Sequence, residues 1–261
     1  MLKCFTVMTV IAISNQKGGV GKTTTTLNLG RALSYIRNKV LLIDLDFQGG
    51  LTLSCGINPD SLEKTIYNAL VGNEPIENLI HNLEHFDLIP ANIDLAGAEV
   101  ELLNEIGRER ILDETIKPLK DKYDFIIIDT PPSLGILTVN ALCSADGVII
   151  PVECKYLGLR GLSILLKTIE KLRKRIKPSL QIVGILPTMY ERTSHSNEVV
   201  GELKEYFKGK IKIFNPVKKT VKFPESVVVG KSIIDYAPTS DVAKEYLNIA
   251  KEVELWAESR Q

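Results

Sequence analysis

The stretch Asn15-Gln16-Lys17-Gly18-Gly19-Val20-Gly21-Lys22-Thr23-Thr24 joins an apolar run to a segment of helical character. Residues 7–13, ahead of it, form a largely β-branched run, which is typical of a strand buried on both faces of a parallel sheet. Residues 24–36, behind it, space their apolar side chains roughly as one face of a helix does. A glycine-rich turn between a buried strand and a helix predicts a loop that holds phosphate groups.

This phosphate loop would direct successive backbone N–H groups and the start of a helix toward one point, which suits a polyphosphate. We expect Lys22 to reach the β- and γ-phosphates of ATP and the Thr23 hydroxyl to bind Mg²⁺. The loop residues predicted to bind nucleotide are Lys17, Gly18, Gly19, Val20, Gly21, Lys22, Thr23 and Thr24.

The loop departs from the usual pattern at one position. Glycine is expected five residues before Gly21, and Gln16 stands there instead, while a second lysine, Lys17, precedes the glycines. Because a predicted strand and a predicted helix flank the two lysines, this indicates a deviant form of the phosphate loop rather than a chance glycine-rich turn.

Two further apolar runs end in carboxylates. Residues 39–44 predict a second buried strand that leads into Asp44 and Asp46, and residues 123–128 predict a third that delivers Asp129. The carboxyl ends of parallel strands form the sheet edge where ligands bind. We therefore expect Asp44 and Asp46 beside the bound nucleotide, and Asp129 at the metal.

Strands and helices are predicted to alternate through most of the chain. Beyond the elements above, we predict strands at residues 86–90, 145–152, 181–186 and 210–214, and helices at residues 93–106, 110–119, 158–175, 197–207 and 241–258. This order predicts an α/β fold in which one doubly wound, mostly parallel sheet carries helices on both faces. With 261 residues and 44% apolar content, residues 1–261 are expected to form a single domain.

Composition bears on whether the protein spans a membrane and on the redox state of its compartment. No stretch of 18 apolar residues occurs, so no membrane span is expected. The four cysteines, Cys4, Cys55, Cys143 and Cys154, show no paired metal spacing. That usage favours a reduced, cytoplasmic protein.

Charge is unevenly distributed along a chain whose formal net charge is zero. Residues 155–222 carry 16 Lys and Arg against 5 Asp and Glu, a net charge of +11, whereas residues 1–154 carry a net charge of −8. The excess predicts a face that binds a polyanion, although single lysines of this kind commonly line solvated helix faces.

Over nearly its full length the chain resembles the ParA/Soj partition ATPases, which share the deviant phosphate loop with MinD and the nitrogenase iron protein. Five motifs carry the resemblance in order: residues 17–24; residues 42–46 with Gln48-Gly49; residues 123–133; residues 188–190 with Arg192-Thr193; and Glu225 with Gly230-Lys231. The resemblance implies an ATPase of slow intrinsic turnover that dimerises around two ATP molecules. It further implies that the ATP-bound homodimer binds double-stranded DNA nonspecifically, until a ParB-type centromere-binding protein stimulates hydrolysis.

The same resemblance implies roles by position. Lys22 matches the phosphate-loop lysine, Thr23 matches the magnesium ligand with Asp129 behind it, and Asp46 matches the residue that positions the attacking water. Lys17 matches the signature lysine that crosses the dimer interface to the partner's nucleotide. A charge supplied in this way would act on the transition state as an arginine finger does.

Residues 217–222 correspond to a basic segment of the family. Lys219 and Lys222 occupy the places of DNA-contacting arginines, and Arg192 is the third candidate DNA contact. Lysine retains the charge there, which suffices for phosphate contacts that carry no sequence information.

Met189, Lys218 and Thr220 are the remaining candidate nucleotide-binding residues. In relatives a proline stands at the position of Lys218 and an asparagine at that of Thr220, and both help to frame adenine. The base contacts of this chain therefore depart from the family pattern.

These observations favour ATP-dependent partition of a chromosome or plasmid by a cytoplasmic, nucleoid-associated protein, and two alternatives stay open. A MinD-like ATPase on a membrane surface would need a basic amphipathic terminal helix, whereas residues 250–258 are acidic. A metabolic enzyme on the same scaffold, such as an iron–sulfur reductase, would need cysteines after the switch strands, and residues 129–132 contain none.

Overall fold

The structure, a computed structural model, describes residues 8–155 and 158–260, apart from the side chains of residues 158–161. The predictions made for Cys4 and Val7 lie outside these residues. The described strands are β1 (Thr9–Ile13), β2 (Val40–Asp44), β3 (His81–Asn82), β4 (Asp87–Ile89), β5 (Phe125–Asp129), β6 (Gly147–Glu153) and β7 (Gln181–Thr188). They form one sheet in the order β3-β4-β2-β5-β1-β6-β7, in which only β3 runs antiparallel to its neighbour among the described pairs.

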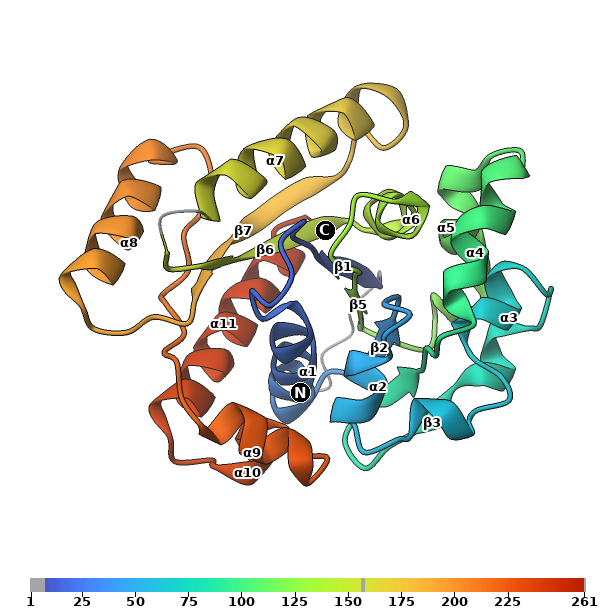
Figure 1. The fold of residues 1–261 in the computed structure, drawn as a ribbon, viewed down its shortest axis with the longest axis horizontal. Coiled ribbons are helices and arrows are strands. Elements are labelled where there is room, and N and C mark those ends of the chain that lie inside the picture. The colour runs from blue at the N-terminus through green and yellow to red at the C-terminus, as the bar shows by residue number, and fades with distance from the viewer. Residues whose placement is uncertain (1–7, 156–157, 261) are drawn as a thin grey trace.

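Helices cover both faces of the sheet. The described α-helices are α1 (Lys22–Tyr35), α2 (Gly50–Ser54), α3 (Ile66–Leu70), α4 (Leu95–Glu101), α5 (Ile111–Thr115), α6 (Ile136–Ser144), α7 (Gly158–Arg175), α8 (Ser194–Tyr206), α9 (Lys222–Val228), α10 (Ile233–Tyr236) and α11 (Asp241–Glu258). Figure 1 shows α7 and α11 on opposite sides of β6 and β7.

The core divides into two layers because strand side chains alternate between the faces. On β1, Val10 and Ala12 belong to the layer that contains residues of α4 to α8, whereas Ile11 and Ile13 belong to the layer of α1, α10 and α11. The sheet is therefore buried on both sides, which explains why its central strands are continuous apolar runs. The predicted doubly wound α/β fold is confirmed.

The first helix lies close against the sheet. A Cβ placed on Gly30 of α1 would fall 2.4 Å from a methyl carbon of Leu42 on β2. Any side chain at position 30 would push α1 away from β2 and shift the phosphate loop at the start of the helix.

Several predicted elements differ from the structure. The strand predicted at residues 210–214 is wrong, because that segment makes only a single described bridge, between Ile185 and Ile213. The helix predicted at residues 93–106 is shorter, since α4 gives way to a 3-10 turn at Leu102–Asn104. The helix predicted at residues 110–119 is interrupted at Ile116, since α5 ends at Thr115 and a 3-10 turn follows at Lys117–Leu119. Pro118 in that turn has no N–H to donate to the preceding turn.

None of the described helices is both long enough and apolar enough to cross a bilayer.

Candidate functional site

The phosphate loop leaves the carboxyl end of β1 and enters α1 at Lys22. Gly19 and Gly21 have φ angles of +71° and +87°, in the left-handed region that glycine adopts without strain. Gly21 is the N-cap of α1, and within the described chain no side chain caps this helix start. Its first backbone N–H groups and the helix dipole therefore favour an anion at this point.

Hydrogen bonds from three neighbouring strands hold the loop. Asn15 Nδ2 donates to the Pro151 carbonyl on β6 at 2.6 Å, and Thr130 Oγ1, just after β5, donates to the Ile13 carbonyl at 2.9 Å. Thr188 Oγ1 at the end of β7 donates to the Val20 carbonyl at 2.8 Å. The loop is thus built rigidly into the edge of the sheet.

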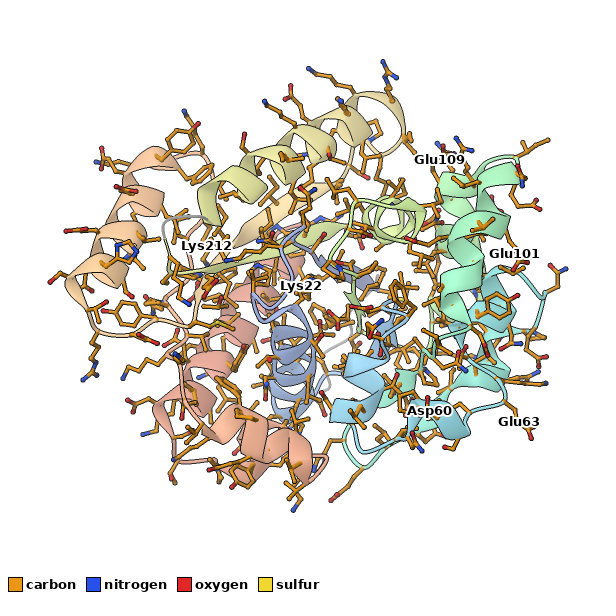
Figure 2. All side chains as sticks on the ribbon, in the orientation of Figure 1. Lys22, Asp60, Glu63, Glu101, Glu109 and Lys212 are labelled. Atoms are coloured by element: carbon orange, nitrogen blue, oxygen red, sulfur yellow. The ribbon has the colours of Figure 1, made fainter. Side chains whose placement is uncertain are left out.

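Lys22 lies near the middle of the molecule, as Figure 2 shows. It is buried, and its ammonium donates to the Lys17 carbonyl at 3.4 Å. Burial lowers the pKa of Lys22, while the carboxylates of Asp129 and Asp46 act in the opposite direction. A buried cation inside a glycine loop is suited to holding phosphate oxygens.

Thr23 and Asp129 form the candidate metal site. Thr23 Oγ1 donates to Asp129 Oδ2 at 2.6 Å, and Thr26 Oγ1 donates to the other carboxylate oxygen at 3.3 Å. Burial and the nearby Asp44 raise the pKa of Asp129 to about 8. A hydroxyl beside a strongly desolvated carboxylate is an oxygen donor set of the kind that Mg²⁺ prefers, so these residues fit the metal.

Asp44 and Asp46 lie at the carboxyl end of β2, and Asp44 is in register with Asp129 on β5. Asp44 Oδ2 accepts hydrogen bonds from the Thr52 amide at 2.9 Å and the Thr52 hydroxyl at 2.8 Å. Burial raises the pKa of Asp44 to about 6 against these hydrogen bonds. Asp44 thereby ties the start of α2 to the sheet, a contact that the sequence did not reveal.

The half-buried Asp46 faces the same end of the sheet. Its backbone N–H donates to Asp44 Oδ1 at 3.1 Å, and its Oδ1 accepts from the Gln48 amide at 3.1 Å. These two hydrogen bonds hold the turn after β2. Among the described residues they use the backbone N–H and Oδ1 of Asp46, so its other carboxylate oxygen stays available for water.

A cavity of about 580 Å³ opens beside the phosphate loop. Its lining includes Gly21 and Thr24 from the loop side together with all three candidate base-binding residues, and the full set is Gly21, Thr24, Thr188, Met189, Val217, Lys218, Lys219, Thr220, Val221, Phe223, Pro224, Val227 and Tyr246. Sequence reasoning missed the apolar wall of Phe223, Pro224 and Tyr246, since α9 and α11 carry no motif that identifies it. The cavity is placed to take the base of a nucleotide whose phosphates lie in the loop.

Of the three candidate DNA-binding residues, Lys219 lines this cavity. Arg192, Lys219 and Lys222 are all exposed. Lys219 Nζ lies 2.5 Å from Glu191 Oε1, next to Arg192 in the chain, and Lys218 Nζ lies 2.6 Å from Asp241 Oδ2. Residues 217–221 thus line the cavity, while Lys219 and Lys222 of the same segment are exposed to solvent.

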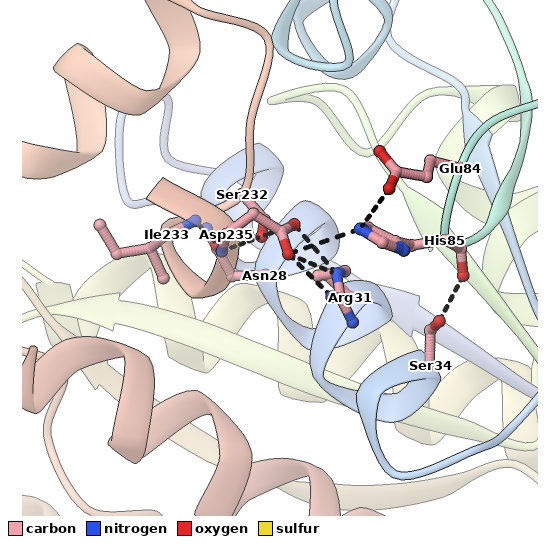
Figure 3. Close-up of polar contacts among 8 residues, drawn as sticks. All are labelled: Asn28, Arg31, Ser34, Glu84, His85, Ser232, Ile233 and Asp235. Carbon is pink, nitrogen blue, oxygen red and sulfur yellow. Dashed lines mark hydrogen bonds and ion pairs between the residues drawn. The ribbon is translucent and has the colours of Figure 1, made fainter. Parts of the chain in front are cut away.

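A polar cluster joins α1 to α10, which follows this segment (Figure 3). Arg31 Nε donates to both carboxylate oxygens of Asp235 at 2.9 Å, and Asn28 Oδ1 accepts from the Ile233 amide at 2.7 Å. The helix that begins at the phosphate loop is thus bonded directly to the element behind the cavity wall.

Comparisons with known proteins agree with this site. A family model described as an AAA domain matches residues 8–182. The sporulation initiation inhibitor protein Soj of Bacillus subtilis is 46% identical over 94% of this chain and 97% of its own length. The chromosome partitioning protein ParA of Myxococcus xanthus is 44% identical over 95% of this chain and 88% of its own.

The chain belongs to the ParA/Soj family of P-loop ATPases. It is an ATPase that uses ATP and Mg²⁺, and the predicted family, enzyme class and cofactors are confirmed. Among solved structures, cobyrinic acid a,c-diamide synthase of Mycobacterium smegmatis with bound ATP analog and magnesium has a TM-score of 0.86 at 36% identity, covering 98% of each chain. Proteins that share this fold can therefore have different names and activities. The fold alone does not determine what happens after the nucleotide binds.

Proposed function

We propose that this chain is a DNA-partitioning ATPase whose ATP-bound homodimer binds double-stranded DNA without sequence preference. The observation that carries the proposal is the segment of residues 217–222. Residues 217–221 line the cavity beside the phosphate loop, and Lys219 and Lys222 of the same segment are exposed. A base in the cavity and a polyanion in solvent would therefore contact one short segment, which links the two binding events.

The chemistry proposed for the site uses residues already described. Lys22 and the loop N–H groups bind the phosphates, and Thr23 with Asp129 holds Mg²⁺, which offsets phosphate charge when bound. Asp46 orients the attacking water, and Lys17 reaches the nucleotide of the partner subunit. We expect slow intrinsic turnover, so that the bound state persists.

The exposed lysines suit phosphate contacts because their present ion pairs are weak. The Lys219 and Glu191 side chains are 60% and 48% exposed. Exposed pairs of this kind contribute roughly 0–1 kcal/mol and are readily exchanged for a DNA phosphate. Such contacts depend on charge and position, not on base sequence.

Release from DNA is proposed to follow hydrolysis stimulated by a ParB-type centromere-binding protein. The names of the relatives, a chromosome partitioning protein among them, support this assignment. The protein would then act in the cytoplasm on the nucleoid and cycle between bound and free forms.

A charge-reversal experiment tests the DNA face. In an Asp46→Ala background that blocks turnover, the pair Lys219→Glu with Lys222→Glu should lower DNA affinity at least about a hundredfold. ATP affinity is measured in parallel because Lys219 also lines the cavity, and it should fall far less than DNA affinity. The matched control, Lys208→Glu with Lys210→Glu, makes the same charge change at exposed positions after α8 and should retain most of the affinity. Equal losses in both variants would mean that general charge, rather than this face, determines binding.

A further inference from the structure

A three-residue ion cluster lies at the end of β6 and includes one residue of the phosphate loop, Lys17. Lys17 Nζ lies 2.6 Å from Glu153 Oε2, and Lys155 Nζ lies 2.7 Å from Glu153 Oε1. One carboxylate is thus shared by two lysines, one from the phosphate loop and one from the segment that follows β6. We call these residues the Glu153 cluster.

The three members of the cluster differ in exposure. The Glu153 side chain is 9% exposed, the Lys17 side chain 39% and the Lys155 side chain 65%. Burial acts to raise the pKa of Glu153, but its hydrogen bonds with Lys155 and Lys17 lower it overall, so the group is a carboxylate at neutral pH. The carboxylate is the fixed centre and the lysines are its movable partners.

The backbone holds this centre at a constant place relative to the loop. Asn15 Nδ2 donates to the Pro151 carbonyl at 2.6 Å, and Asn15 Oδ1 accepts from the Lys17 amide at 3.0 Å. Pro151 lies two residues before Glu153 on the same strand. Only the flexible side chain of Lys17 therefore needs to move for the ion pair to break.

We propose that Glu153 is a positioning residue that holds Lys17 within its own subunit before ATP-dependent pairing of subunits, and that Lys155 lets it release Lys17. This inference rests on the proposed function, in which Lys17 reaches the partner's nucleotide. In this proposal Lys17 leaves its own Glu153 to reach the phosphates across the interface. The resting contact therefore competes with assembly.

Lys155 is the second cation that pairs with Glu153. Removing the only partner of a buried carboxylate is strongly unfavourable, because the charge is left uncompensated. With Lys155 on the other oxygen, Glu153 keeps a cation when Lys17 leaves. The exposed Lys155 thus makes release easier, and its loss should bind Lys17 more tightly to Glu153.

Opposite shifts in two variants test the proposal. Dimer formation is followed by analytical ultracentrifugation against ATP concentration with Mg²⁺, in the Asp46→Ala parent. Glu153→Gln should lower the ATP concentration for half-maximal dimerisation by about threefold or more, and Lys155→Gln should raise it by a similar factor. Thermal unfolding is recorded for each variant.

The outcomes separate this inference from the proposed function. A parent that stays monomeric with ATP contradicts both. A parent that dimerises while Glu153→Gln needs the same or more ATP overturns the role of Glu153 alone, since a purely structural ion pair can only hinder assembly when broken. If Glu153→Gln does not fold, Lys155→Gln still decides, because its exposed side chain is dispensable for folding and an unchanged or lowered ATP requirement refutes the proposal.

Discussion

Two buried carboxylates, Asp44 and Asp129, are next to each other in register on β2 and β5. Both are fully buried, and each is held by threonine hydroxyls, Thr52 for Asp44 and Thr23 with Thr26 for Asp129. Hydrogen bonds only partly offset the desolvation of two like charges, so the site favours a nearby cation. We therefore expect the residues that shape the site to lower the stability of the protein when nothing is bound.

The first prediction concerns pH. Burial on folding raises the pKa of Asp129 to about 8 and that of Asp44 to about 6, from 3.8 for an exposed aspartate. Between those pH values the folded state therefore binds more protons than the unfolded state. Stability from these groups is present below about pH 4 and lost as pH rises through 6 and 8, by at most about 1.4 kcal/mol per pH unit for each group. Urea unfolding of nucleotide-free protein in EDTA should show this loss.

The variant Asp129→Asn serves as the comparison for that measurement. Its free energy of unfolding should fall less steeply between pH 6 and pH 8, because the titrating carboxyl is gone. A parallel pH dependence in the two proteins would contradict the assignment of a raised pKa to Asp129.

The sequence predicted which residues lie at the site better than it predicted the contacts that those residues make. Lys22, Thr23 and Asp129 were found because each follows a strand or a glycine turn that motif spacing identifies. The pairing of Lys17 with Glu153 joins residues 136 positions apart, and the Thr52 contact with Asp44 depends on how α2 folds back. Such contacts depend on tertiary geometry that no local pattern encodes.

Among the elements, α1 connects the phosphate loop to the far side of the cavity. Its Arg31 side chain is 9% exposed and pairs with Asp235 of α10, which is 24% exposed, and His85 Nε2 lies 3.7 Å from the same carboxylate. Figure 3 shows these groups converging from α1, α10 and the turn between β3 and β4. The Arg31–Asp235 ion pair therefore adds to the Asn28 hydrogen bond with Ile233 in holding α10 against α1.

The second prediction tests that ion pair. Arg31→Ala should lower the free energy of unfolding by about 1–3 kcal/mol, less than for a fully buried pair because Asp235 is partly solvated. The double variant Arg31→Met with Asp235→Leu should recover part of the loss, since no charge is left unpaired. Denaturant titration measures both, and purely additive losses would show that the two residues act independently.

Helices were predicted correctly where apolar side chains recur at helical spacing over many residues. The bounds predicted for α7 and α11 agree with the structure because each is an 18-residue amphipathic helix, and α11 also has Ser240 as an N-cap that accepts from the Ala243 amide. The sequence did not indicate α9 and α10, because helices of seven and four residues are too short for a periodic signal. Residues 210–214 resemble a strand in composition but find only one partner.

Across the whole molecule, charge is segregated. In Figure 2 the labelled acids Asp60, Glu63, Glu101 and Glu109 lie on the side of α2 to α5, whereas Lys212 lies on the opposite side near α8. These four acids belong to residues 1–154, of net charge −8, and Lys212 belongs to residues 155–222, of net charge +11. A polyanion approaching from solution would be oriented toward the basic side.

The third prediction follows from counting phosphate contacts. If Arg192, Lys219 and Lys222 each neutralise one phosphate in both subunits of a dimer, the logarithm of DNA affinity should fall with the logarithm of salt concentration with a slope of about −5. Replacing Lys219 and Lys222 with glutamine should bring the slope to about −2. A slope unaffected by these substitutions would assign the contacts to other residues.

The central claim is that nucleotide state controls the DNA face, and fluorescence anisotropy of a labelled DNA duplex measures this directly. With Asp46→Ala protein at fixed salt and Mg²⁺, duplexes of unrelated sequence should bind with ATP and should bind at least about tenfold more weakly with ADP. Equal binding with ATP, with ADP and without nucleotide would contradict the account.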